Sequence, residues 1–184
     1  MNDVIRAAIG GIVGAIAMFV VGMIFWASPL NNLAYSSVDE GRSAAVQLAL
    51  ATNLPHTGRY QVPDVNTAGG TTLYGRGPVA TIDYNMRGFS TSDPATMIGG
   101  FVQEAVASLM IAFALFAISF RVTDFTTRFR AGLGLTAAAT VMITLSDPIF
   151  AHGPWNFAIY NLIACLAMLT SATFVITRWF LPQP

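Results

Sequence analysis

The chain has 184 residues, of which 54 % are apolar and only 10 % are charged, and its mean hydropathy is +0.60. A single soluble domain with a hydrated surface does not reach these values, so the composition predicts a membrane protein. The nine basic residues are all Arg and balance nine acidic ones, which excludes a basic footprint for nucleic acid. One Cys and two His are too few for a zinc cage, a disulfide framework or an iron–sulfur cluster.

Four long apolar stretches are predicted to cross the membrane as helices. A helix needs about 20 largely apolar residues to cross roughly 30 Å of hydrocarbon. The predicted transmembrane helices are residues 7–30, 94–120, 131–151 and 155–177. We therefore expect an all-α membrane protein with four transmembrane helices. Its second and third helices are joined by a loop at 121–130, and a small α+β insert at 31–93 separates the first two.

The positions of the arginines predict the orientation of these helices. Five of the nine flank the helices on one side: Arg6, Arg121, Arg128, Arg130 and Arg178. Lys and Arg concentrate in short cytoplasmic flanks, so both termini are expected in the cytoplasm and the insert outside it. The first helix has too long an apolar run for a cleavable signal peptide and is expected to stay as an anchor.

Local signals divide the insert into a helix and a β-ribbon. The sequence Ser37-Val38-Asp39-Glu40 is typical of a capping box with Ser37 as the N-cap, and it predicts a helix that extends to about Thr52. Residues 59–63 and 79–84 have strand composition and are separated by Gly-rich and Pro-rich turns, which predicts an antiparallel ribbon. The insert is close to the lower size limit for independent folding, so we expect it to lean on the membrane helices.

Two prolines mark predicted helix boundaries. Asp93-Pro94 has the pattern of a cap followed by proline at the first helical position, which is expected to begin the second transmembrane helix. Pro148 disfavours helical backbone at Asp147, so the third helix is expected to be shorter than the second.

Four polar residues are expected at similar depth near the outer ends of the last three helices: Glu104, Asp147, His152 and Asn161. In a single bundle they would surround a common mouth that could hold a lipid headgroup, a quinone or an ion. Alternatively, each one caps a helix or joins two helices by a hydrogen bond. A second alternative is that His152 binds a tetrapyrrole or a metal, although no partner ligand has suitable spacing.

The first predicted helix has a face of small residues. Gly10, Gly14 and Gly22 belong to this face, and their spacing is of the kind that lets a neighbouring backbone approach closely. The neighbour could be another helix of the same chain or a partner protein.

Sequence templates for catalysis are missing. The chain has no G-x-S-x-G elbow, no H-E-x-x-H motif and no P-loop. We therefore expect a non-catalytic protein without a cofactor, acting as an accessory or scaffolding subunit of a larger membrane assembly. Its expected neighbours are the lipid bilayer and either a membrane-protein partner or a second copy, but no nucleic acid. The alternative is a binder or conductor of a small apolar or amphipathic ligand at the polar mouth.

One short motif carries a resemblance to known proteins. The stretch Leu54-Pro55-x-x-Gly58-x-Tyr60-x-x-Pro63, after a first helix that ends near Trp26, resembles a group of four-span bacterial inner-membrane proteins. These proteins have an extracytoplasmic insert after the first helix and no assigned activity. The resemblance implies a multi-pass protein of the bacterial inner membrane with a periplasmic insert, and it implies no functional residue.

Overall fold

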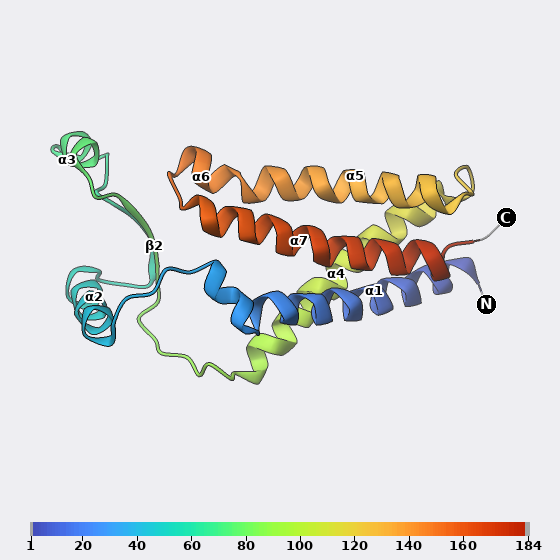
Figure 1. Cartoon of the computed structure of the whole chain (residues 1–184), viewed down its shortest axis with the longest axis horizontal. Helices are drawn as coiled ribbons and strands as arrows, with labels where there is room; N and C mark the ends of the chain where they lie inside the picture. The colour runs from blue at the N-terminus through green and yellow to red at the C-terminus, as the bar shows by residue number, and fades with distance from the viewer. Residues whose placement is uncertain (1, 183–184) are drawn as a thin grey trace.

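The computed structural model describes residues 2–182. Within these residues, four helices are long and apolar enough to cross a membrane. They are α1 (Asp3–Trp26), α4 (Pro94–Ser119), α5 (Phe125–Thr144) with its short continuation α6 (Ser146–Phe150), and α7 (Trp155–Val175) with the π-helical segment η2 (Ile176–Phe180). Both termini lie at one end of this bundle and the insert lies at the other (Figure 1). The predicted class, four apolar helices with a small sheet, is confirmed.

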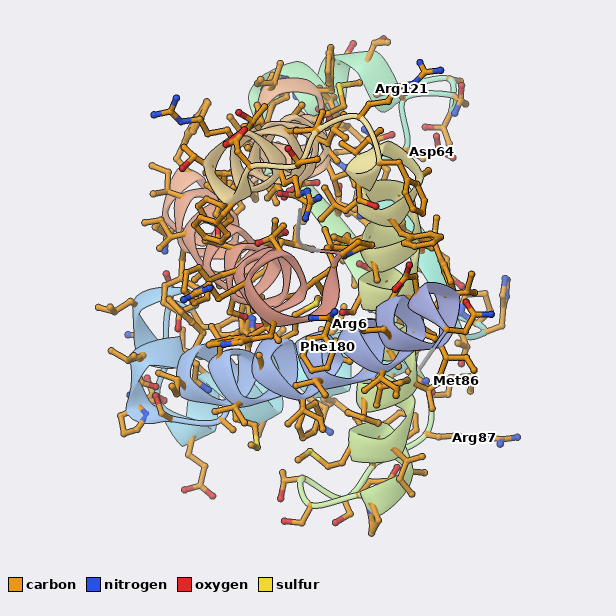
Figure 2. The ribbon with its side chains drawn as sticks, turned by 90° about the vertical axis from the view of Figure 1, so that its right-hand side faces the viewer. Arg6, Asp64, Met86, Arg87, Arg121 and Phe180 are labelled. Atoms are coloured by element: carbon orange, nitrogen blue, oxygen red, sulfur yellow. The ribbon has the colours of Figure 1, made fainter. Side chains whose placement is uncertain are left out.

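Helix α1 is the centre of the bundle. It packs along α4 and along α7, while α5 packs mainly on α7. Helix α4 crosses α1 obliquely and has few contacts with α5 or α7 (Figures 1 and 2). The buried core accordingly joins α1, α4 and the end of α7 through Met18, Ala112, Leu115, Ala172 and Ile176. The position of α4 therefore depends on its contact with α1.

Glycines make the contact between α1 and α4 close. A Cβ atom added at Gly11 would lie 2.7 Å from a side-chain carbon of Leu109 and 3.0 Å from its Cα. A Cβ atom added at Gly14 would lie 2.5 Å from the Ser108 Oγ. Larger residues at either position would separate the two helices, because the atoms of α4 already occupy this space.

Aspartate side chains begin two of the long helices. Asp93 accepts a hydrogen bond from the Ala95 amide at 3.1 Å and Pro94 is the first helical residue, which confirms the predicted cap. Asp124 accepts from the Thr127 amide at 2.8 Å, so α5 begins at Phe125, well before the predicted residue 131. The apolar run gave no sign of this start, because the first turns of α5 contain two arginines.

The Asp124 cap predicts a pH dependence of stability. Hydrogen bonds from the hydroxyl and amide of Thr127 hold the pKa of the Asp124 carboxyl below its usual value. The contribution of the cap is therefore present above the unfolded-state pKa of about 4, and it is lost as the pH falls through the lower folded-state pKa. Thermal unfolding in detergent between pH 7 and pH 2 should show this loss. Asp124→Asn should weaken it, since Asn also caps helices but does not titrate in this range. An equal pH slope in the two proteins would contradict the assignment.

The α5–α6 junction differs from the expectation for Pro148. Asp147 lies within the short helix α6, so the prediction that Pro148 would keep it out of a helix was wrong. The interruption falls at Leu145 instead. Pro148 has no amide hydrogen, so it cannot donate to the carbonyl four residues earlier, and the hydrogen-bond ladder of α5 stops there.

The ribbon of the insert forms as predicted. Strands β1 (Gly58–Val62) and β2 (Ala80–Tyr84) pair antiparallel, with Tyr60 opposite Ile82. Between them lies a short helix, α3 (Gly70–Arg76), where the sequence predicted only turns. A 3₁₀ turn, η1 (Pro29–Leu33), connects α1 to the insert.

Helix α2 (Glu40–Asn53) stands apart from the bundle. Its N-cap is Asp39, which accepts from the Arg42 amide at 2.9 Å, so the predicted capping box with Ser37 as the cap was wrong. None of its residues is buried, and Figure 1 shows it projecting beyond the insert-side end of the bundle. The expected support of the insert by the membrane helices is therefore not found for α2.

Candidate functional site

A cleft of about 820 Å³ separates the β-ribbon from the insert-side ends of α5, α6 and α7. We call it the insert–bundle cleft. One wall is the ribbon and the other is the bundle, so residues far apart in the sequence face the same space. Polar side chains from several elements converge on this cleft.

The ribbon wall is polar because of strand alternation. Arg59 and Gln61 on β1, with Thr81 and Asp83 on β2, line the cleft. Residues two apart in a strand share a face, and the pairing places Arg59 opposite Asp83 and Gln61 opposite Thr81. The Arg59 Nε lies 3.4 Å from the Asp83 Oδ1. Both side chains are mostly exposed, so this ion pair is available to solvent or to a ligand.

The bundle wall combines polar and apolar side chains. Asp147 of α6 and Asn161 of α7 line it together with Ile143, Phe150 and Phe157. The Asp147 carbonyl oxygen accepts from the amides of Ala151 at 2.9 Å and Gly153 at 3.3 Å, which fixes the backbone of the turn that follows α6. Asn161 accepts a hydrogen bond from the Cys165 thiol at 3.4 Å.

The structure brings together two of the four residues predicted for a polar mouth. Asp147 and Asn161 line the cleft, whereas Glu104 and His152 are not among the described residues that line it. His152 lies in the turn between α6 and α7 with a left-handed backbone (φ 55°). Its ring lies 6.4 Å from that of Tyr74 on α3. This contact joins the insert to the end of the bundle.

Glu104 faces α1 instead of the cleft. Its Oε1 would lie 3.4 Å from a Cβ added at Gly22. Its Oε2 is buried and has no hydrogen-bond partner within residues 2–182, and the same holds for the Oγ of Ser108, one turn further along α4. The two side chains form a polar strip against the glycine face of α1, and hydrocarbon is a costly place for such groups.

The small-residue face of α1 contacts other helices of the same chain. Gly10 lies against Phe180, and Figure 2 shows Phe180 beside Arg6 where α1 meets η2. Arg6 also donates to the Trp179 carbonyl at 2.9 Å. A Cβ at Gly22 would lie 3.0 Å from the terminal methyl carbon of Met168 on α7. With Gly14 against Ser108, all three predicted glycines face elements of the bundle.

The described part of the chain has no cluster of metal-binding side chains. No three His, Cys, Asp or Glu side chains within residues 2–182 come close enough to hold a metal ion. The two histidines lie beside different aromatic rings, with His56 5.9 Å from Tyr60 and His152 beside Tyr74.

A buried arginine at the opposite end of the bundle was missed by the sequence analysis, which assigned it to a loop. Arg128 is 1 % exposed. It donates to the carbonyl oxygens of Ser119 at 2.8 Å and Pro182 at 2.6 Å, and from its Nε to that of Val122. One guanidinium thus joins the end of α4, the α4–α5 loop and the second residue after η2. Small or polar residues buried at every fourth position of α5 could have indicated it: Arg128, Gly132, Thr136, Thr140 and Thr144.

Comparison of the chain with models of protein families, with curated proteins and with solved structures gives no match. Its function is therefore inferred from its own residues and geometry.

Proposed function

We propose that the protein is a non-catalytic accessory or scaffolding subunit of a larger assembly in a bacterial inner membrane. In this proposal the four helices anchor the chain and the insert, outside the cytoplasm, contacts a partner protein. The observation that carries the proposal is helix α2, which is formed although none of its residues is buried and it has no extensive contact with another helix or strand of residues 2–182.

An unsupported helix of this length is unusual. Isolated helices shorter than about 12–15 residues are marginal in water, since most helical stability in proteins comes from a packed face. Helix α2 has 14 residues and no buried one, and it exposes apolar side chains, with Val46 57 % and Leu48 69 % accessible. A surface that covers these side chains would supply the missing packing.

The charge and composition of α2 favour a protein as this surface over the membrane itself. Helices that lie on membranes carry Lys or Arg on their polar face and large aromatic anchors on the other. Helix α2 has one Arg and no aromatic residue, and Arg42 is already paired with Asp39 at 3.2 Å. A neutral, Ala-rich helix with scattered Val and Leu matches a protein surface better.

The proposed orientation is supported by the arrangement of charge. The five arginines expected in the cytoplasm belong to the N-terminal segment, the α4–α5 region and η2, all at the end of the bundle that holds both termini (Figure 1). The positive-inside rule then assigns that end to the cytoplasm and the insert to the other side.

The partner should be lost when the exposed apolar residues of α2 are made polar. The full chain would be extracted from its native membrane into nanodiscs and analysed by native mass spectrometry, as the parent protein and as the double variant Val46→Ser/Leu48→Ser. We expect a second polypeptide at fixed stoichiometry with the parent and its loss with the variant. The bundle should be unaffected, because α2 has no extensive contact with it and both side chains are mostly exposed.

Leu73→Ser is the matched control, since Leu73 is also exposed in the insert but belongs to α3. It should retain the partner. A parent protein that runs as a stable monomer, or a co-purifying polypeptide that all three proteins retain equally, would contradict an α2-mediated accessory role.

A further inference from the structure

The insert–bundle cleft has charges of opposite sign on opposite walls. The ribbon wall presents Arg59, paired with Asp83, and the bundle wall presents Asp147. The Arg59 Nε lies 3.4 Å from the Asp83 Oδ1, and 67 % of the Arg59 side chain is exposed, so its guanidinium is accessible to a ligand in the cleft. Asp147 is exposed, and its carboxylate lies against Gly153, with Oδ2 in the space that a Cβ there would take. Its carbonyl oxygen accepts from the amides of Ala151 and Gly153, which holds the main chain of this turn. The cleft therefore offers an exposed guanidinium on one wall and an exposed carboxylate on the other, which together match a zwitterion.

The cleft also has an apolar side that continues onto the surface of the membrane helices. Ile143 near the end of α5 is 74 % exposed, and Phe150 at the end of α6 is 79 % exposed. Both line the cleft, and Phe157 of α7 extends this apolar surface inward. Large apolar side chains at the end of a membrane-spanning helix are covered by acyl chains in a bilayer. A molecule with its polar part between the walls and its apolar part along α5 would satisfy both surfaces.

We propose that the insert–bundle cleft binds the phosphoethanolamine headgroup of a zwitterionic phospholipid. The guanidinium of Arg59 holds the phosphate and the carboxylate of Asp147 accepts from the primary ammonium. The amide and hydroxyl groups of Gln61, Thr81 and Asn161 surround the headgroup, and the acyl chains lie along Ile143 and Phe150. This proposal goes beyond the accessory role and is independent of whether α2 binds a partner.

The charges in the cleft favour this headgroup over the other common ones. An anionic headgroup without an ammonium would bring its negative charge to a cleft with two carboxylates, Asp83 and Asp147, and one guanidinium. A choline headgroup has no N–H to donate to Asp147, so it would lose the charge-assisted hydrogen bond that a primary ammonium makes there. A planar fork such as that of Arg59 suits phosphate.

The test is lipid retention by the full chain. The protein would be placed in nanodiscs that contain equal amounts of phosphatidylethanolamine, phosphatidylcholine and phosphatidylglycerol, and the lipids that stay bound on release would be counted by native mass spectrometry. We expect a preference of about tenfold for phosphatidylethanolamine over phosphatidylcholine, the ratio that corresponds to one charge-assisted hydrogen bond of about 1.4 kcal/mol. Asp147→Asn should reduce this ratio to near one. Asp64→Asn, in a loop of the insert outside the described cleft lining, should leave it unchanged.

Arg59 provides a second, different readout. Arg59→Gln should lower the retention of phosphatidylethanolamine and phosphatidylcholine alike, because both carry the phosphate, and Arg59→Lys should restore part of it. Arg87→Gln is the control, since Figure 2 shows Arg87 pointing outward, away from the bundle. Equal retention of the three lipids by the parent protein, or preference for phosphatidylglycerol, would overturn the proposal. Soluble phosphoethanolamine has no acyl chains, so at an equal concentration it should not displace the lipid. Displacement would contradict the proposal that the cleft binds a membrane lipid.

Discussion

Arg128→Met is expected to lower the free energy of unfolding by about 3–5 kcal/mol, because three carbonyl groups lose a donor and each such loss costs about 1–3 kcal/mol when the group is buried. The guanidinium donates to three main-chain carbonyls, from Ser119, Val122 and Pro182, and Met can donate to none of them. These three carbonyls belong to the end of α4, the α4–α5 loop and the segment after η2. The substitution should therefore loosen the loop and release the segment after η2. Thermal unfolding of the purified protein in detergent would measure the loss.

Two variants identify the cause of this loss. Arg130 lies two residues after Arg128 and is exposed. Arg130→Met removes the same charge, so it should change the free energy of unfolding by less than about 0.5 kcal/mol. Arg128→Lys keeps the charge but replaces a rigid fork by a single ammonium, so it should fall between the parent and Arg128→Met. Equal unfolding temperatures for Arg128→Met and Arg130→Met would show that the three hydrogen bonds contribute nothing measurable.

Gly14→Val is expected to destabilise the bundle by about 1–3 kcal/mol, as added atoms do in a well-packed interior. A Cβ at this position would lie 2.5 Å from the Ser108 Oγ and 3.2 Å from a side-chain carbon of Ile176, so it would push α1 away from both α4 and the end of α7. Because α4 has few other contacts, its position should change more than that of α7. Unfolding temperature and distances between spin labels on α1 and α4 would measure the two effects.

The matched control for this substitution is Gly134→Val. A Cβ at Gly134 would meet nothing within 4 Å, so a valine there should be tolerated. Adding Ser108→Ala to Gly14→Val removes the nearest obstructing atom and should recover part of the stability, as expected for residues in direct contact. A double variant as unstable as Gly14→Val alone would show that Ser108 does not limit the approach of the two helices.

The sequence was sufficient for those parts of the fold that depend on neighbouring residues. Apolar length predicted the four membrane helices, Asp93-Pro94 predicted the start of α4, and strand composition predicted the ribbon. The start of α5 was missed because an arginine such as Arg128 is typical of a loop unless its hydrogen-bond acceptors are known. Two of its three acceptors, the carbonyls of Ser119 and Pro182, lie outside α5 and the loop before it. The capping-box pattern predicted Ser37 as the N-cap of α2, and this was wrong because the side chain of Asp39 caps the helix instead.

The candidate site divides in the same way. Depth along a helix can be counted in the sequence, and two residues counted to similar depth, Asp147 and Asn161, line a common cleft. The direction in which a residue faces depends on helix packing, so nothing in the sequence showed that Glu104 would face α1. The polar wall of the ribbon was also missed, because the position of Arg59 relative to the bundle is set by tertiary structure.

The central position of α1 has a consequence for biogenesis. A ribosome delivers α1 to the bilayer before the other three membrane helices, so α4 and α7 each meet their main neighbour already in place. Helix α5 is different, because its main neighbour is α7, which is synthesised after it. Between these two insertion events α5 has little to hold it. Arg128 can complete its hydrogen bonds only after residue 182 has been synthesised. The contact that fixes the start of α5 to the rest of the bundle therefore forms after all four helices have left the ribosome.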